Sequence, residues 1–134
     1  GPATDDSKAE EPHNTDLLNR IKDVLGDDIG DVKYSKRLTD SPVCLVAPDN
    51  GVDMHMERVL KIHQNYTPST KPVLEINANH PLIKKLESLE PAQPGFKDAA
   101  LLLLDQAKII QGEPIKDAAG FARRMADFIV KGLS

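Results

Sequence analysis

The side chains best suited to chemistry in this sequence are a single cysteine, Cys44, and four histidines. A nucleophilic thiol needs a neighbour that lowers its pKa, and a structural metal needs ligands at short spacings such as CxxC or HxxxH. Neither pattern is formed by Cys44 with His55, His63 or His80. Because Cys44 lies in a short apolar run, we expect a buried, inert cysteine and no metal. A small free-standing cytoplasmic enzyme that uses Cys44 or a histidine is the alternative.

Basic side chains gather at two places, and neither predicts a phosphate site. Lys33, Lys36 and Arg37 fit one face of an ordinary strand, and no glycine-rich phosphate loop is visible in the sequence. Arg123 and Arg124 lie on the polar side of a predicted helix. They are either solvated charges or partners of Asp105 or Asp127 on a second copy of the chain. The sequence therefore predicts no catalytic residue and no cofactor.

Composition and charge indicate one globular domain that follows a polar, acidic N-terminal segment. The chain has 134 residues, 40% of them hydrophobic, and no apolar run approaches the roughly 20 residues of a membrane span. Five of the 21 acidic side chains but one of the 17 basic ones fall in residues 1–16, which leaves 16 of each beyond. A balanced domain gives no electrostatic signature of nucleic-acid binding.

The expected division is a tag scar at 1–2, an acidic flexible linker at 3–15 and a domain at 16–134. The chain begins without Met and without a signal peptide, so we expect a cytoplasmic fragment.

The elements that would position these side chains follow from apolar spacing and turn residues. The sequence predicts helices at 16–25, 52–64, 80–90, 96–111 and 118–133, and strands at 32–38, 43–47 and 73–76. Thr15, Asn79 and Asp117 are the expected N-caps. We expect the first two strands to form an antiparallel hairpin, with 43–47 central and a right-handed crossover leading to the third strand. The class is α+β, with a small mixed three-stranded sheet.

The last two helices carry more apolar side chains than one buried face can use. Phe96, Ala100 and Leu103 form one stripe, but further apolar residues broaden it towards a second face, and the helix at 118–133 repeats the pattern. This predicts a homodimer that buries the second face, and a monomeric adaptor domain is the rival. The candidate contacts are Leu101, Leu102, Leu104, Ile109, Phe121, Phe128 and Ile129.

The helix at 52–64 supports two interpretations. Val52, Met56, Val59 and Leu60 share one face. That face could pack on the sheet, as most apolar stripes do. Alternatively it stays partly exposed and binds unfolded client chains, for which a flexible Met is suited.

Three segments, in order, resemble the C-terminal domain of the ninety-kilodalton heat-shock chaperone family, most closely its bacterial HtpG type. They are RLTDSPVCLVAPD (37–49), LEINANHPLIKKL (74–86) and LLLLDQAKIIQGEPIKDAAGFARRM (101–125). Ala78 and Ala118 stand where the family usually has proline. The resemblance implies a heat-shock and stress-response role in protein folding, with client proteins as partners. It also implies that the last two helices of two copies form a four-helix bundle, and that ATP and Mg²⁺ bind an N-terminal domain absent from this chain.

Overall fold

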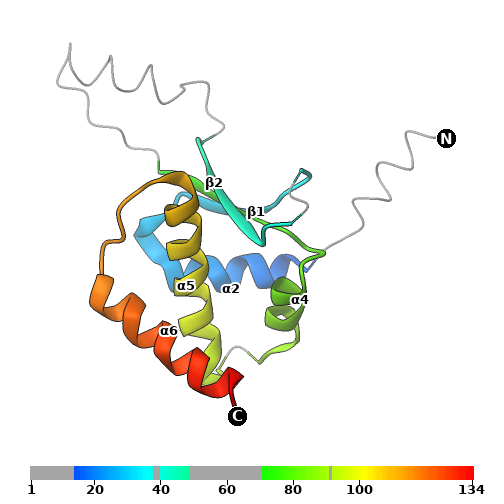
Figure 1. Ribbon diagram of the computed structural model, residues 1–134. Coiled ribbons are helices and arrows are strands. Elements are labelled where there is room, and N and C mark those ends of the chain that lie inside the picture. Colours follow the sequence, from blue (N-terminus) through cyan, green and yellow to red (C-terminus); the bar gives the residue numbers. More distant parts are fainter. Residues whose placement is uncertain (1–13, 38–39, 49–70, 91) are drawn as a thin grey trace.

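The computed structural model describes residues 14–37, 40–48, 71–90 and 92–134. Figure 1 shows a small sheet with helices on one side of it, which confirms the α+β class with a three-stranded mixed sheet. Residues 3–13 of the predicted linker and the predicted helix at 52–64 lie outside the described residues, whereas Asn14 and Thr15, the last two residues of that linker, belong to the start of a helix. The elements are α2 (Thr15–Leu25), the 3-10 turn η1 (Gly26–Asp28), β1 (Asp31–Tyr34), β2 (Val43–Val46), β3 (Val73–Ile76), α4 (Pro81–Ser88), α5 (Pro94–Gln111) and α6 (Ala118–Gly132).

The strand order is β1-β3-β2, so the predicted hairpin of the first two strands is wrong. β3 runs parallel to β1, with Leu74 opposite Val32, and antiparallel to β2, with Leu74 also opposite Leu45. The segment predicted as central is therefore an edge strand. Burial accounts for the central place of β3, because three of its four side chains are buried, whereas the β2 side chains alternate between buried and half-buried. The turn residues after β1 mark a change of direction, but they do not specify which strand is the partner.

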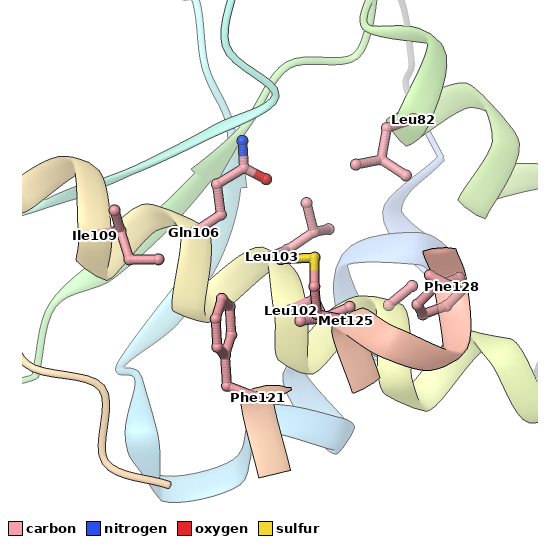
Figure 2. A pocket seen from close by; sticks show the side chains of 9 residues that line it. Leu82, Leu102, Leu103, Gln106, Ile109, Phe121, Met125 and Phe128 are labelled. Atoms are coloured by element: carbon pink, nitrogen blue, oxygen red, sulfur yellow. The ribbon is translucent and has the colours of Figure 1, made fainter. Parts of the chain in front are cut away.

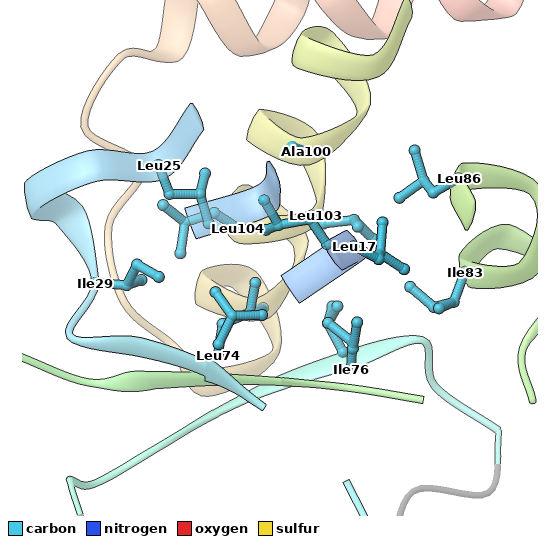
Figure 3. Close-up of a cluster of buried hydrophobic side chains, with 14 of the residues drawn as sticks. Leu17, Leu25, Ile29, Leu74, Ile76, Ile83, Leu86, Ala100, Leu103 and Leu104 are labelled. Carbon is cyan, nitrogen blue, oxygen red and sulfur yellow. The ribbon is translucent and has the colours of Figure 1, made fainter. Parts of the chain in front are cut away.

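The core lies between one face of the sheet and the helices α2 and α5, with α4 closing one end (Figure 3). Val32, Leu45, Leu74 and Ile76 line the sheet side. Aliphatic side chains fill most of the space, as the scarcity of aromatic residues requires. The helical side contributes Leu17, Ile21, Leu25, Ile83, Leu86, Phe96, Ala100, Leu103, Leu104 and Ala107.

Two of the three predicted N-caps are displaced by one residue. Asn14, not Thr15, caps α2 and accepts a hydrogen bond from the Leu17 amide at 3.1 Å. His80, not Asn79, caps α4, because Pro81 opens that helix and forces the residue before it to be extended. The third prediction is confirmed, since Asp117 caps α6 and accepts from the Gly120 amide at 3.0 Å.

Arg20 of α2 holds the start of α5 in place. Its Nη1 donates a 2.9 Å hydrogen bond to the carbonyl oxygen of Leu89, the C-cap of α4. Its guanidinium also lies 5.0 Å from the centre of the Phe96 ring, which is within the range of a cation–π contact. The position of α5 relative to the core is thus fixed at its N-terminal end.

Candidate interaction surface on helices α5 and α6

Helix α5 has two apolar faces, and only one of them is used by the core. Pro94 begins the helix, and Gly112 ends it with φ of +81°, a left-handed conformation that glycine adopts without strain. Phe96, Ala100 and Leu103 point into the core. A neighbouring face carries Leu102 and Ile109, neither of which belongs to the core cluster. The 18-residue length of α5 makes this second face a long one.

Helix α6 lies against α5 at the end of the molecule opposite the sheet (Figure 1). Among the described elements, α5 is the one with which α6 makes extensive contact. Phe121, Met125 and Phe128 recur at intervals of four and three residues, so they share the side of α6 that faces α5. None of these three side chains is fully buried.

An open groove of about 380 Å³ runs between the two helices. Figure 2 shows Phe121, Met125 and Phe128 of α6 on one side of it and residues of α5 on the other, with Leu82 of α4 at one edge. Gln106 is the one polar side chain among its described lining residues. A groove with this lining offers apolar contact and almost no hydrogen bonding, so it is suited to another apolar surface.

Large apolar side chains are also exposed beyond the groove. Ile110 lies at the end of α5, Ile129 and Val130 lie in the last turns of α6, and Leu133 follows that helix as its C-cap. Ile129 is 53% exposed and Leu133 is 82% exposed. Single exposed apolar residues are common, but here four of them gather near the C-terminal ends of the two helices that form the groove. We call the groove, together with these exposed apolar side chains near the C-terminal ends of the two helices, the α5–α6 surface.

The structure brings most of the predicted contact residues to this surface. Leu102, Ile109, Phe121 and Phe128 line the groove, and Ile129 is exposed beside it. The other two belong to the core side. Leu104 is buried in the core cluster and Leu101 is half-buried against it, so both side chains are covered by the chain itself.

Three residues of this region were not among the predicted contacts. Leu82 lines the groove from α4, one position before the buried Ile83. The apolar spacing within α4 does not predict that Leu82 lies beside α5. Met125 was visible in the apolar stripe of its helix. Arg124 is buried on α6. The sequence could not show this, because Arg123 and Arg124 are adjacent and nothing in their local sequence indicates which of the two is buried. The client-contact candidates Val52, Met56, Val59 and Leu60 lie outside the described residues.

Cys44 is placed where its thiol is hard to ionise. It is half-buried on β2, and its Sγ lies 4.0 Å from Oε1 of Glu75 on β3. Burial raises the pKa of the thiol, and the Glu75 carboxylate raises it further, while Arg37 opposes the rise. A thiol held in its neutral form is a poor nucleophile.

Among the described residues, no group of three His, Cys, Asp or Glu side chains is placed to hold a metal ion. No helix among them is both long and apolar enough to span a bilayer.

The whole chain, and not only this surface, is similar to known proteins. A family model described as Hsp90 protein matches residues 3–134. Chaperone protein HtpG of Paramagnetospirillum magneticum is 45% identical over 135 residues, which cover 96% of this chain and 22% of that protein. The HtpG proteins of Azorhizobium caulinodans and Rhodospirillum rubrum are 40% and 43% identical, over 98% and 87% of this chain. The chain spans about a fifth of the length of these relatives.

Proposed function

Because this chain belongs to the Hsp90 protein family, we propose that it is the module that joins two copies of a chaperone into a homodimer. The observation that carries the proposal is the distribution of residues on α6. Arg124 is the one buried residue of that helix, whereas Met125, Ile129, Val130 and Leu133 are exposed. A helix that served only its own chain would bury its apolar side chains and expose its arginine.

A second copy is the occupant that suits the α5–α6 surface best. One chain offers both a groove and, beside it, protruding apolar side chains at the end of α6. Two copies related by a two-fold axis could exchange these features, so that each fills part of the surface of the other. Such an arrangement of α5 and α6 from each copy would be a four-helix bundle. It would need to bury on the order of 1,600 Å² in total to be specific.

The role of the dimer in the whole chaperone is mechanical. Two long arms joined at one end meet each other at a high effective concentration, so that their closure becomes nearly intramolecular. This chain would supply the joint, and nucleotide binding and hydrolysis would belong to other parts of the protein. Calorimetric titration of this chain with ATP and Mg²⁺ should then give no heat of binding. A stoichiometric signal would contradict the assignment.

Light scattering coupled to size exclusion tests the homodimer directly. The wild-type chain should have twice its monomer mass at micromolar concentration. Met125→Lys and Ile129→Lys each place a charge on the exposed apolar surface of both copies, and either change should weaken the dimer by roughly tenfold or more. Ala92→Lys, at an exposed position before α5, is the matched control and should leave the mass unchanged. A monomeric wild-type chain at tens of micromolar would refute the proposal.

A contact with client proteins is the second proposed role, carried by Val52, Met56, Val59 and Leu60. Its basis is their common face on the predicted helix at 52–64. Replacing Met56 and Leu60 with Gln should reduce chaperone action of the full-length protein and leave the melting temperature of this chain nearly unchanged. Burial of that face predicts the opposite result, since two buried large-to-polar changes cost several kcal/mol. A large fall in melting temperature would therefore exclude a client-binding role for this face.

A further inference from the structure

We propose that Gln106 is a specificity-determining residue of the homodimer, because its amide forms a hydrogen bond with the second copy in one arrangement and loses its water without replacement in others. This role rests on the proposed function, since it acts only where a second copy covers the groove between α5 and α6. Apolar contact then supplies the affinity, and Gln106 selects among the arrangements that apolar contact permits.

Gln106 occupies an apolar position of α5. Leu102 and Leu103 lie four and three residues before it, and Ile109 lies three residues after it, so the four side chains share one side of the helix. Figure 2 shows Gln106 between Ile109 and Leu103 along the α5 wall of the groove. The spacing of the helix predicts an apolar residue at position 106, and the glutamine is an exception to that pattern.

The single chain makes no use of the amide of Gln106. None of the described residues forms a hydrogen bond with this side chain, and the other described residues that line the groove are all apolar. The side chain is half-buried in an open groove, so its two N–H donors and its carbonyl oxygen stay within reach of water. A leucine at this position would therefore cost the fold of one chain no hydrogen bond.

A second copy that covers the groove changes the surroundings of this amide. Covering removes the water, and a polar group that loses water without a new hydrogen bond weakens binding by roughly tenfold or more. In a two-fold dimer the loss occurs twice, once in each copy. An arrangement that offers each Gln106 a donor or acceptor from the other copy avoids the loss. A single polar residue in an apolar seam between helices specifies register and oligomeric state in this way, at a cost in affinity.

Apolar contact alone gives the α5–α6 surface little ability to distinguish one arrangement from another. Met125 is 40% exposed and Ile109 is 52% exposed, and their attraction to another apolar surface has no preferred direction. A hydrogen bond does have one. Arrangements that bury the same apolar area therefore differ in whether the amide of Gln106 is paired, and this difference excludes the unpaired ones.

The first test asks whether a second copy covers Gln106. Gln111, the last residue of α5, is exposed and lies outside the described lining of the groove, so it is the matched control. Gln106→Glu places a carboxylate in each covered groove and should raise the dimer dissociation constant, measured by sedimentation equilibrium at pH 7, by roughly a hundredfold. Gln111→Glu should change it by less than about twofold. Equal small effects of the two substitutions would overturn the inference.

The second test asks whether Gln106 selects the alignment. Lys33 is exposed on β1, at the end of the molecule away from α6 (Figure 1), and Lys33→Cys in a Cys44→Ala chain accepts a single spin label. Pulsed electron resonance then measures the distance between the labels of the two copies. This chain should give one narrow distance, as should the same chain with Gln111→Leu. Gln106→Leu should give several distances or a broad distribution.

Affinity separates selection from ordinary contact. Gln106→Leu should lower the dissociation constant, by up to roughly tenfold, because an apolar side chain replaces an amide that must be desolvated. A single narrow distance in the Gln106→Leu chain would overturn the inference. A tenfold rise in its dissociation constant would do the same, since Gln106 would then contribute affinity and not selection.

The homodimer and the role of Gln106 fail in distinguishable ways. A monomeric wild-type chain would refute the homodimer, and the role of Gln106 with it. A dimeric wild-type chain whose alignment survives Gln106→Leu would refute the role of Gln106 alone and leave the homodimer intact.

Discussion

At the scale of single residues, Tyr34 shows how burial acts on an ionisable group outside any functional site. Its hydroxyl donates a 2.8 Å hydrogen bond to the carbonyl oxygen of Asn14, the residue that caps α2. Burial raises the pKa of Tyr34 from 10.0 to about 12, the Glu87 carboxylate adds to the rise, and Arg20 opposes it. The folded chain therefore holds this proton more tightly than the unfolded chain does.

The sign of the resulting pH dependence follows from linkage. The contribution of Tyr34 to folding is fully present below pH 10 and is lost as the pH rises from 10 to about 12. In a Tyr66→Phe chain, which leaves one tyrosine, ultraviolet titration should show ionisation near pH 12 in the folded state. Tyr34→Phe should lose the hydrogen bond, at a cost of about 1 kcal/mol in the free energy of unfolding. Ionisation at the ordinary tyrosine pKa would show that the Tyr34 hydroxyl is neither buried nor hydrogen-bonded to Asn14.

At the scale of the elements, the sequence predicted which segments form helices and strands much better than it predicted their partners. Helix α2 and strand β3 begin and end within a residue of their expected bounds. The predicted pairing of β1 with β2 was wrong, because a turn signal is local, whereas the place of β3 between them depends on segments far away in the chain. Similarly, apolar spacing identified α5 and α6 as two-sided, but it could not assign Leu104 to the core or Arg124 to a buried position.

Helix α6 offers a direct test of local structure at its first residue. Ala118 is exposed, and Asp117 before it is non-helical, with φ of −124° and ψ of 83°. Proline is favoured at the first position of a helix, where its missing N–H is not needed. Ala118→Pro should therefore raise the free energy of unfolding by about 0.4–1 kcal/mol, because it restricts the unfolded chain.

Urea denaturation at a fixed chain concentration measures this gain. Ala122→Pro, one turn further on, is the control, and it should destabilise the helix by roughly 3 kcal/mol because it removes an internal hydrogen bond. Equal losses from both substitutions would show that α6 does not begin at Ala118.

At the scale of the whole molecule, dimerisation links stability to concentration. If two folded chains associate and unfolded chains do not, each tenfold rise in concentration adds about 1.4 kcal/mol to the stability of the dimer. The melting temperature of the wild-type chain should therefore rise between micromolar and higher concentrations. Met125→Lys, with its weaker dimer, should have a melting temperature that rises less over the same range of concentration. A melting temperature of the wild-type chain that is independent of concentration would point to a monomer.

The central position of β3 also has a consequence for the order in which this chain folds. In the described sheet, β1 and β2 have no contact as partners, and each pairs with β3. Neither can form an early hairpin, so sheet formation waits until Val73–Ile76 reaches strands that precede it in the sequence. Such non-local pairing is slow, whereas the hairpin of α5 and α6 needs only contacts between neighbours. The surface proposed for a second copy could then assemble before the sheet that supports it, which would expose apolar groups to other unfolded chains during folding.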